Sequence, residues 1–156
     1  MTNPKTTTPE STVRLAVDDL APHMAEALEA LDTASRKTSL ETSLLELVRT
    51  RVAQINGCAY CVDMHSKDAR KAGESEHRLY LLPAWRESIS FSERERAALE
   101  LAEAMTRLAD SHVTDEVFAR AAAPFSETEL AELIWAVTVI NAWTRLGATA
   151  RPWPLP

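Results

Sequence analysis

The chain has 156 residues, of which 46% are hydrophobic and 26% are charged, and its formal net charge at pH 7 is −6. This length fits one domain with its own core, and the acidic balance argues against a nucleic-acid surface, because neutralising phosphates requires a basic patch. No apolar run approaches the ~20 residues that a membrane helix needs, so we expect no membrane partner. With only 3 glycines and much alanine, leucine and glutamate, the composition predicts an all-α fold.

The chain begins with a polar segment. Residues 1–12 are rich in threonine, proline and serine, and we predict that they form a mobile tail ahead of a single helical domain over 13–150. This segment lacks the apolar stretch of a secretory signal. We therefore expect a cytoplasmic protein.

Two helices are predicted in the first third of the chain. The first covers about 18–33, with one of the aspartates at 18 and 19 as its cap. The second covers about 40–55 and carries an apolar stripe at helical spacing. It is expected to end at Asn56-Gly57, because glycine suits the left-handed conformation just past a helix end.

The third predicted helix, over about 58–72, carries the only two cysteines of the chain, Cys58 and Cys61. Their spacing lets a disulfide close within one helical turn. A free cysteine has a pKa of about 8.5, and a position at a helix start favours the reactive thiolate. His65 lies four residues beyond Cys61, hence on the same helix face. In a chain without an export signal, this pair indicates redox chemistry or metal binding rather than a structural staple.

Glu46 is expected to lie opposite His65. If the second and third helices fold back at Gly57, Glu46 precedes that turn by 11 residues and His65 follows it by 8. At ~1.5 Å rise per residue, the two side chains fall at comparable heights. Glu46, His65 and Cys61 would then form a proton path, directly or through a water.

Other interpretations of these residues stay open. Glu46 alone could be a solvated acid paired with Arg49 or Thr50. The two cysteines could be inert packing residues. They could also bind zinc together with His65, in which case a fourth ligand would have to come from another histidine. The candidates are His23, His77 and His112.

The second half of the chain is marked by capping residues. Residues 74–91 form either a short helix broken at a proline or a packed loop. Ser92 and Ser126 each open a helix with a capping-box pattern, and a short helix over 114–122 begins with a threonine cap. The proline-rich tail over 151–156 cannot be helical.

The last predicted helix is apolar on more than one face, and the chain has four tryptophans. A monomer of this size can hardly bury all of these side chains, so we expect a homo-oligomer with a buried subunit interface. The tryptophans are Trp85, Trp135, Trp143 and Trp153.

The stretch from Glu46 to His65 resembles the core of the AhpD-like alkylhydroperoxidases of the carboxymuconolactone decarboxylase superfamily. In that pattern a glutamate is followed twelve positions later by Cys-x-x-Cys-x-x-x-His, which Glu46, Cys58, Cys61 and His65 match. The match covers about residues 40–73. The resemblance implies a helical bundle of the AhpD-like type, in which a helical hairpin carries the cysteines. It also implies trimers or hexamers and a peroxidase that needs no haem, flavin or metal.

The resemblance also implies a role for each residue. Cys61 would attack the peroxide, Cys58 would resolve the product as a disulfide, Glu46 and His65 would relay protons, and an external dithiol would restore the pair. Tyr60 stands where the best-known peroxidase members have a histidine; it can donate a hydrogen bond but is a poor base at neutral pH. One alternative is a lactone decarboxylase, which has no need of a thiol pair. The other is a non-enzymatic helical oligomer that senses redox state.

Overall fold

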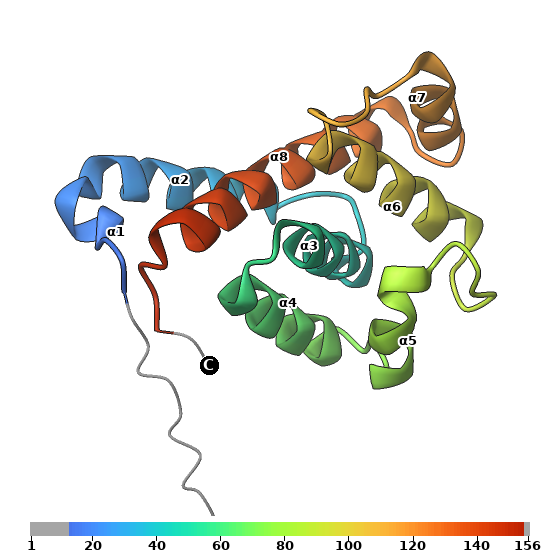
Figure 1. Cartoon of the computed structure of the whole chain (residues 1–156). Coiled ribbons are helices and arrows are strands. Elements are labelled where there is room, and N and C mark those ends of the chain that lie inside the picture. Colours follow the sequence, from blue (N-terminus) through green and yellow to red (C-terminus); the bar gives the residue numbers. More distant parts are fainter. Residues whose placement is uncertain (1–12, 155–156) are drawn as a thin grey trace, which may run out of the picture.

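The computed structural model describes residues 13–154, which contain helices and connecting segments but no β-strand. The all-α prediction is confirmed (Figure 1). The elements are α1 (Val17–Leu20), α2 (Pro22–Ser35), α3 (Thr42–Asn56), α4 (Ala59–Lys71), α5 (Glu76–Leu81), the 3-10 helix η1 (Leu82–Ala84), α6 (Glu93–Thr106), α7 (Asp115–Ala122) and α8 (Glu127–Ala150). The tail predicted over 1–12 lies outside the described residues. None of the described helices is both long and apolar enough to cross a bilayer.

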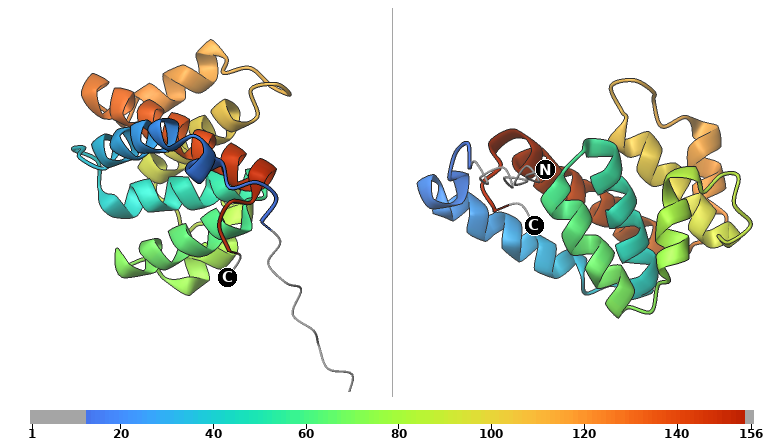
Figure 2. Two further views of the ribbon diagram at one scale, coloured as in Figure 1. Left: turned by 90° about the vertical axis from the view of Figure 1, so that its left-hand side faces the viewer. Right: turned by 60° about the horizontal axis from the view of Figure 1, so that its bottom comes forward.

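Helix α3 lies at the centre of the fold, and every residue from Leu44 to Ala53 is buried. It packs against α4, α6 and α8. The 24-residue helix α8 crosses the molecule, with α2 packed on it and the α3–α4 pair next to it (Figures 1 and 2). Through these contacts α3 connects its hairpin partner α4 to α6 and to the long final helix α8.

The prediction of a single helix over 18–33 is wrong, because the structure contains two helices there. Helix α1 ends at Leu20 and α2 begins at Pro22. Proline lacks the backbone N–H that would continue α1, and it restricts the residue before it, Ala21, which adopts φ −135° and ψ 60°. The expected aspartate cap is also wrong: Ala21 precedes α2 and makes no side-chain cap bond, while both aspartates lie inside α1.

The other predicted boundaries depend on local chemistry and are confirmed. Gly57 ends α3 in the left-handed conformation at φ 67°. Ser92 and Ser126 both form complete capping boxes, and the Thr114 hydroxyl accepts the backbone N–H of Val117. In the segment 74–91 the chain adopts the helical alternative, as α5 followed by η1. Residues 151–154 are not helical, and residues 155 and 156 of the predicted tail lie outside the described residues.

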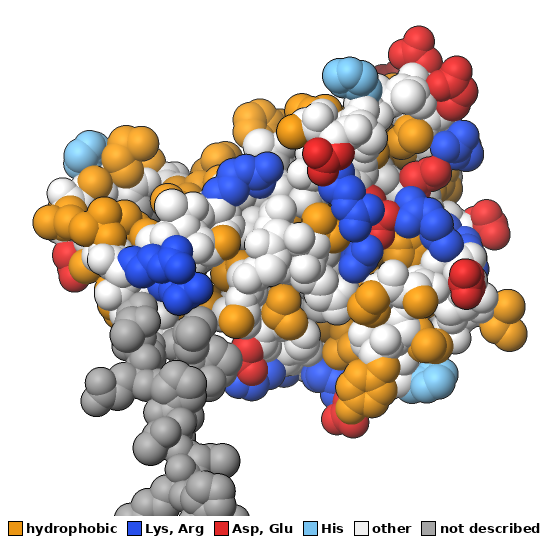
Figure 3. Space-filling model, in the orientation of Figure 1, with side chains coloured by type: hydrophobic (Ala, Val, Ile, Leu, Met, Phe, Trp, Pro, Cys, Tyr) orange, Lys and Arg blue, Asp and Glu red, His pale blue; other side chains and the backbone are white. Residues whose placement is uncertain are grey.

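The tryptophans differ in burial. Trp85 is buried, whereas Trp135 is 57% exposed and Trp143 and Trp153 are half-buried. Large apolar side chains are also exposed on α1 and α2, among them Leu20 at 70% and Met24 at 63%. Figure 3 shows apolar side chains gathered over this end of the molecule. A single copy of the chain thus leaves considerable apolar surface in contact with water.

Candidate active site

Cys58 and Cys61 are joined in a disulfide, with their Cα atoms 5.3 Å apart. Cys58 is the residue that caps α4, and its sulfur accepts the backbone N–H of Cys61 at 3.3 Å. The two residues are only 3% and 2% exposed. The pair therefore occupies the start of a helix, where unpaired N–H groups stabilise negative charge on sulfur once the bond is reduced.

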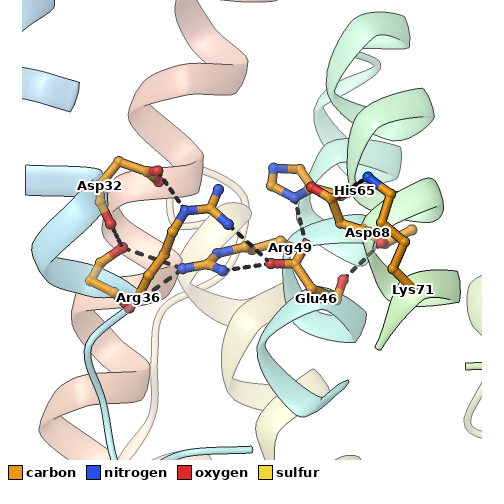
Figure 4. Close-up of polar contacts among 9 residues, drawn as sticks. Asp32, Arg36, Glu46, Arg49, His65, Asp68 and Lys71 are labelled. Atoms are coloured by element: carbon orange, nitrogen blue, oxygen red, sulfur yellow. Dashed lines mark hydrogen bonds and ion pairs between the residues drawn. The ribbon is translucent and has the colours of Figure 1, made fainter. Parts of the chain in front are cut away.

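The hairpin of α3 and α4 brings Glu46 and His65 into contact. His65 Nδ1 lies 2.8 Å from Glu46 Oε2, and both side chains are 2% exposed (Figure 4). The predicted approach of these two residues is confirmed. A neutral imidazole that donates its Nδ1 proton to a carboxylate keeps Nε2 as the basic nitrogen. Glu46 thus fixes the orientation of the His65 ring, with Nε2 on the side of the ring away from the carboxylate.

Arg49 completes this buried cluster. Its Nη1 donates to Glu46 Oε1 at 2.7 Å, so the carboxylate is shared between a guanidinium and an imidazole. The alternative pairing of Glu46 with Arg49 is therefore real, but it accompanies the His65 contact instead of replacing it. Thr50 does not pair with the carboxylate, because its hydroxyl donates to the backbone carbonyl of Glu46 at 2.7 Å. Glu46 is not a solvated acid.

The electrostatics of the cluster keep Glu46 ionised. Burial by itself would raise the pKa of Glu46, but its hydrogen bonds and charge interactions with His65 and Arg49 outweigh burial and lower that pKa below its ordinary value. Glu103, on α6, follows the same pattern: burial opposes ionisation, and hydrogen bonds from Arg86, Trp85 and Arg51 lower its pKa. Both buried carboxylates are therefore negative at neutral pH.

The lowered pKa of each of these two carboxyl groups predicts how the stability of the protein depends on pH. A carboxyl group whose folded-state pKa lies below its unfolded value, about 4.3 for glutamate, stabilises the protein above that value. The contribution is lost as the pH falls through the folded-state pKa. We expect the free energy of unfolding, measured with urea, to decrease as the pH is lowered below about 4, and to decrease less in Glu46→Gln. Equal dependence in wild type and variant would contradict the assignment.

A cavity of about 230 Å³ opens beside Cys61 and His65. Aromatic side chains of Tyr60, Trp143 and Trp153 form much of its wall. The α2 side of the same cavity carries charged residues, which are Glu29, Asp32 and Arg36. A small molecule in this space would meet the sulfur of Cys61 next to the imidazole.

The long helix α8 approaches the disulfide at Gly147. A Cβ atom at this position would lie 2.6 Å from Cys58 Sγ and 3.0 Å from the ring of Trp153. Contacts shorter than 3.0 Å force atoms to move. The absence of a side chain at Gly147 thus lets α8 pack closely over the disulfide.

The substitution Gly147→Ala tests whether the close approach to Cys58 outweighs the higher helix propensity of alanine. In an ordinary helix interior the change stabilises by about 0.5–1 kcal/mol. Here we expect the opposite sign, a loss of about 1–3 kcal/mol from overpacking, in the oxidised protein. The loss should be smaller after reduction, because a free Cys58 side chain can rotate away. Urea unfolding of both redox forms measures the effect, and stabilisation of the oxidised form would refute the close approach.

Among the described residues, the side chains that could bind a metal do not gather around the cysteines as the zinc alternative requires. Within residues 13–154, the group of three or more potential ligands within reach of one another is Glu46, His65 and Asp68. Both carboxylate oxygens of Glu46 are already engaged, one by His65 and one by the cationic Arg49 (Figure 4). The histidines at 23, 77 and 112 do not join the cysteines in such a group.

Sequence reasoning missed several residues of the site. Arg49 was expected only as an alternative partner of Glu46, although its position three residues later on the same helix face also allows it to join the His65 pair. Trp153 and Gly147 could not have been found from the sequence, because they reach the cysteines only through the packing of α8 and the segment after it. Asp18 is equally remote in sequence, yet it accepts a hydrogen bond from Trp153 Nε1 at 2.9 Å.

Known proteins resemble this chain over most of its length. It is 37% identical over 134 residues to the uncharacterized protein YdfG of Bacillus subtilis (strain 168), covering 86% of this chain and 91% of that protein. It is 35% identical over 114 residues to the uncharacterized protein YnjA of Escherichia coli (strain K12), covering 72% of this chain and 62% of that protein.

A solved structure has the same fold. It is the crystal structure of an Agrobacterium tumefaciens protein of unknown function, described as a candidate antioxidant defence protein AhpD. The two superpose with a TM-score of 0.87 and 34% sequence identity, over 92% of this chain and 98% of the other. This similarity confirms the AhpD-like arrangement of helices.

The model of the carboxymuconolactone decarboxylase family matches residues 22–104. That range is more than half of the chain, and it contains the α3–α4 hairpin with Glu46, both cysteines and His65. Together with the AhpD-like fold, this match shows that the chain belongs to the carboxymuconolactone decarboxylase family.

Proposed function

We propose that this protein is a cysteine-based peroxidase that reduces peroxides through the Cys58–Cys61 pair. The observation that carries the proposal is the buried hydrogen bond between Glu46 and His65 on the α3–α4 hairpin, beside a cavity that His65 lines together with Cys61. The description of the Agrobacterium protein as a candidate antioxidant defence protein supports the same kind of activity.

The first step uses Cys61 and His65. His65 Nε2 takes the proton of the Cys61 thiol, and the thiolate attacks the terminal oxygen of a hydroperoxide. The O–O bond breaks, Cys61 becomes a sulfenic acid, and the leaving alkoxide takes the proton back from His65 as an alcohol. The Glu46 carboxylate accepts the hydrogen bond from Nδ1 throughout, so the ring can take up and release a proton at Nε2 without changing its orientation.

The second step closes the disulfide. Cys58 gives its proton to His65 and attacks the sulfur of Cys61, and the hydroxide that leaves becomes water with that proton. An external dithiol then reduces the disulfide by exchange and is itself oxidised. The net result is one peroxide reduced to alcohol and water for each dithiol oxidised. Tyr60 lines the cavity at Cys61, where its hydroxyl is a candidate hydrogen-bond donor to the substrate.

The proposal includes assembly into a homo-oligomer, either a trimer or a hexamer. The exposed apolar side chains of α1 and α2, such as Leu20 and Met24, support this part, because a monomer rarely leaves such a surface in water. Trp135 on α8 adds to the same argument.

The test is a stopped-flow reaction of the reduced protein with hydrogen peroxide and with an organic hydroperoxide, in which free thiols are counted before and after. We expect both thiols of each chain to be lost at a rate well above that of a free thiol such as N-acetylcysteine. A rate equal to that of the free thiol would refute peroxidase activity. A second sample with alkylated cysteines is given γ-carboxymuconolactone, and its turnover there would favour the decarboxylase alternative.

A further inference from the structure

The disulfide is flanked by two cavities, and each cavity touches a different sulfur-bearing residue. The first, of about 230 Å³, is lined by Cys61 and His65 but not by Cys58. The second, of about 210 Å³, is lined by Cys58 but not by Cys61. The proposed peroxide reaction uses only the first cavity. The second cavity has no role in it, although it leads to the same disulfide.

Two aromatic side chains border both of these cavities. They are Tyr60 and Trp153, and their rings pack with centroids 5.0 Å apart. Trp153 also packs edge-on against Trp143 at 5.8 Å and donates its Nε1 hydrogen to Asp18. The segment that follows α8 is thus fixed from several sides, and Trp153 borders both the space at Cys61 and the space at Cys58.

Thiol–disulfide exchange has a strict direction of approach. The attacking thiolate, the attacked sulfur and the leaving sulfur lie in line, so the nucleophile must arrive on the side opposite the leaving sulfur. Because Cys58 lines the second cavity and Cys61 does not, a thiol bound there would attack Cys58, with Cys61 as the leaving group. Cys61 lines a cavity together with His65, which could then supply a proton to the leaving thiolate.

The chemical character of the two cavities also differs. In the described chain, the one charged side chain that lines the second cavity is Arg151. The first cavity instead carries the carboxyl groups of Glu29 and Asp32 with a single arginine, Arg36. An anion is therefore favoured by charge in the second cavity and disfavoured in the first.

From these observations we propose that the second cavity is the reductant site: a thiol that carries an anionic group binds there, is selected by Arg151, and attacks Cys58. This inference rests on the proposed function only in taking the disulfide as the form to be reduced. The peroxide and the reductant would then reach the pair from separate openings, so neither has to leave before the other arrives.

The reductant thiolate forms a bond to Cys58 Sγ while the Cys58–Cys61 bond breaks, and Cys61 leaves as a thiolate that is protonated next to His65. A second thiol attacks the sulfur of the bound reductant, which releases Cys58 as a thiolate and the reductant as its disulfide. Two electrons pass from the reductant to the protein.

Three small thiols that differ in one group test the selection. 2-Mercaptoethanesulfonate, 2-mercaptoethanol and cysteamine carry a negative, a neutral and a positive group on the same two-carbon thiol. Reduction of the oxidised protein is followed at low salt, and each rate is divided by the rate at which the same thiol reduces a neutral small-molecule disulfide at the same pH, because thiols of different pKa differ in thiolate fraction and in nucleophilicity. We expect the sulfonate to react about three- to tenfold faster than the neutral thiol, and cysteamine to react most slowly.

Arg151→Gln should remove this order, whereas Arg70→Gln should keep it. Arg70 is a matched control, because it is an exposed arginine on α4 that pairs with Glu76 and lines neither cavity. An order that survives in Arg151→Gln, or equal rates of the three thiols with the wild type, would overturn the selection by Arg151.

The attacked sulfur is identified by trapping. Oxidised protein is mixed with the sulfonate thiol, quenched with acid at the earliest time points, alkylated and mapped by mass spectrometry. We expect the mixed disulfide on Cys58 in the wild type and on both cysteines in Trp153→Ala, which removes a side chain that borders both cavities. An early adduct on Cys61 in the wild type would overturn the proposal, whatever the folding of the variant.

The same data separate this inference from the peroxidase proposal. If the reduced protein fails to react with peroxides but the adduct maps to Cys58 with the expected charge order, the peroxidase proposal fails and the reductant site stands. If peroxides oxidise the protein rapidly but the adduct maps to Cys61, the reductant site fails and the peroxidase stands.

Discussion

Cys61→Ser is expected to abolish peroxide consumption, because it removes the sulfur that lies in the cavity with His65. Serine keeps the size and the helix-start position of the side chain but is a far weaker nucleophile than a thiolate. Turnover with a dithiol reductant should fall to that of a protein lacking both cysteines. The assay is the loss of an organic hydroperoxide over time.

Cys58→Ser provides the contrast. Cys61 can still attack the peroxide in this variant, but no second sulfur closes the disulfide, so we expect one oxidation event per chain. The product is a sulfenic acid that dimedone traps and mass spectrometry locates at residue 61. Trapped sulfenic acid in Cys61→Ser instead of Cys58→Ser would reverse the two roles, and equal turnover in the double variant would end the peroxidase proposal.

Glu46→Gln is expected to have the second largest effect, on stability and on activity together. The change leaves the buried Arg49 guanidinium without its carboxylate partner. Breaking a buried ion pair from one side costs about 3–5 kcal/mol, because the remaining charge is desolvated and uncompensated. Urea unfolding at neutral pH measures this loss. Adding Arg49→Met should recover part of it, since the orphaned charge is then removed as well.

The effect of Glu46→Gln on activity is separable from its effect on folding. Glutamine cannot hold the Nδ1 proton as a carboxylate does, so proton transfer at Nε2 is impaired, and we expect the rate of thiol oxidation to fall about 10²-fold. Glu103→Gln is the matched control, because Glu103 is equally buried and ion-paired but bonds Arg51 and Trp85, away from the cysteines. Its stability should fall while its rate per folded molecule is kept. Similar rate losses in both variants would mean that Glu46 acts through stability alone.

Features encoded within a few neighbouring residues could be predicted from the sequence. The capping serines at 92 and 126 set helix starts because a side-chain oxygen and a backbone N–H three residues on suffice to form the cap. Gly57 set a helix end because only its own backbone conformation is involved. The same local reasoning failed at residue 22, where the proline was not weighed against the apolar spacing around it.

The contact between Glu46 and His65 is intermediate between features set by neighbouring residues and contacts set by the packing of distant segments. It joins residues 19 positions apart, yet it was predictable because two helices and one turn fix their relative heights. Arg36, which follows the last residue of α2, also approaches the same carboxylate, at 3.4 Å from Glu46 Oε1, and no pattern near it in the sequence predicted this contact. Its position depends on where α2 packs.

The sequence by itself determined the helical class, most helix ends and the set of reactive groups on the α3–α4 hairpin, because these follow from short-range hydrogen bonding and helical spacing. Only the tertiary structure decided what surrounds those groups. The burial of Glu46 with Arg49, the closeness of Gly147 to Cys58, and the position of Trp153 at the border of two cavities all come from the packing of α2, α8 and the final segment on the hairpin. Such contacts join residues up to 135 positions apart, as between Asp18 and Trp153, and side-chain packing across that distance leaves no local pattern in the chain.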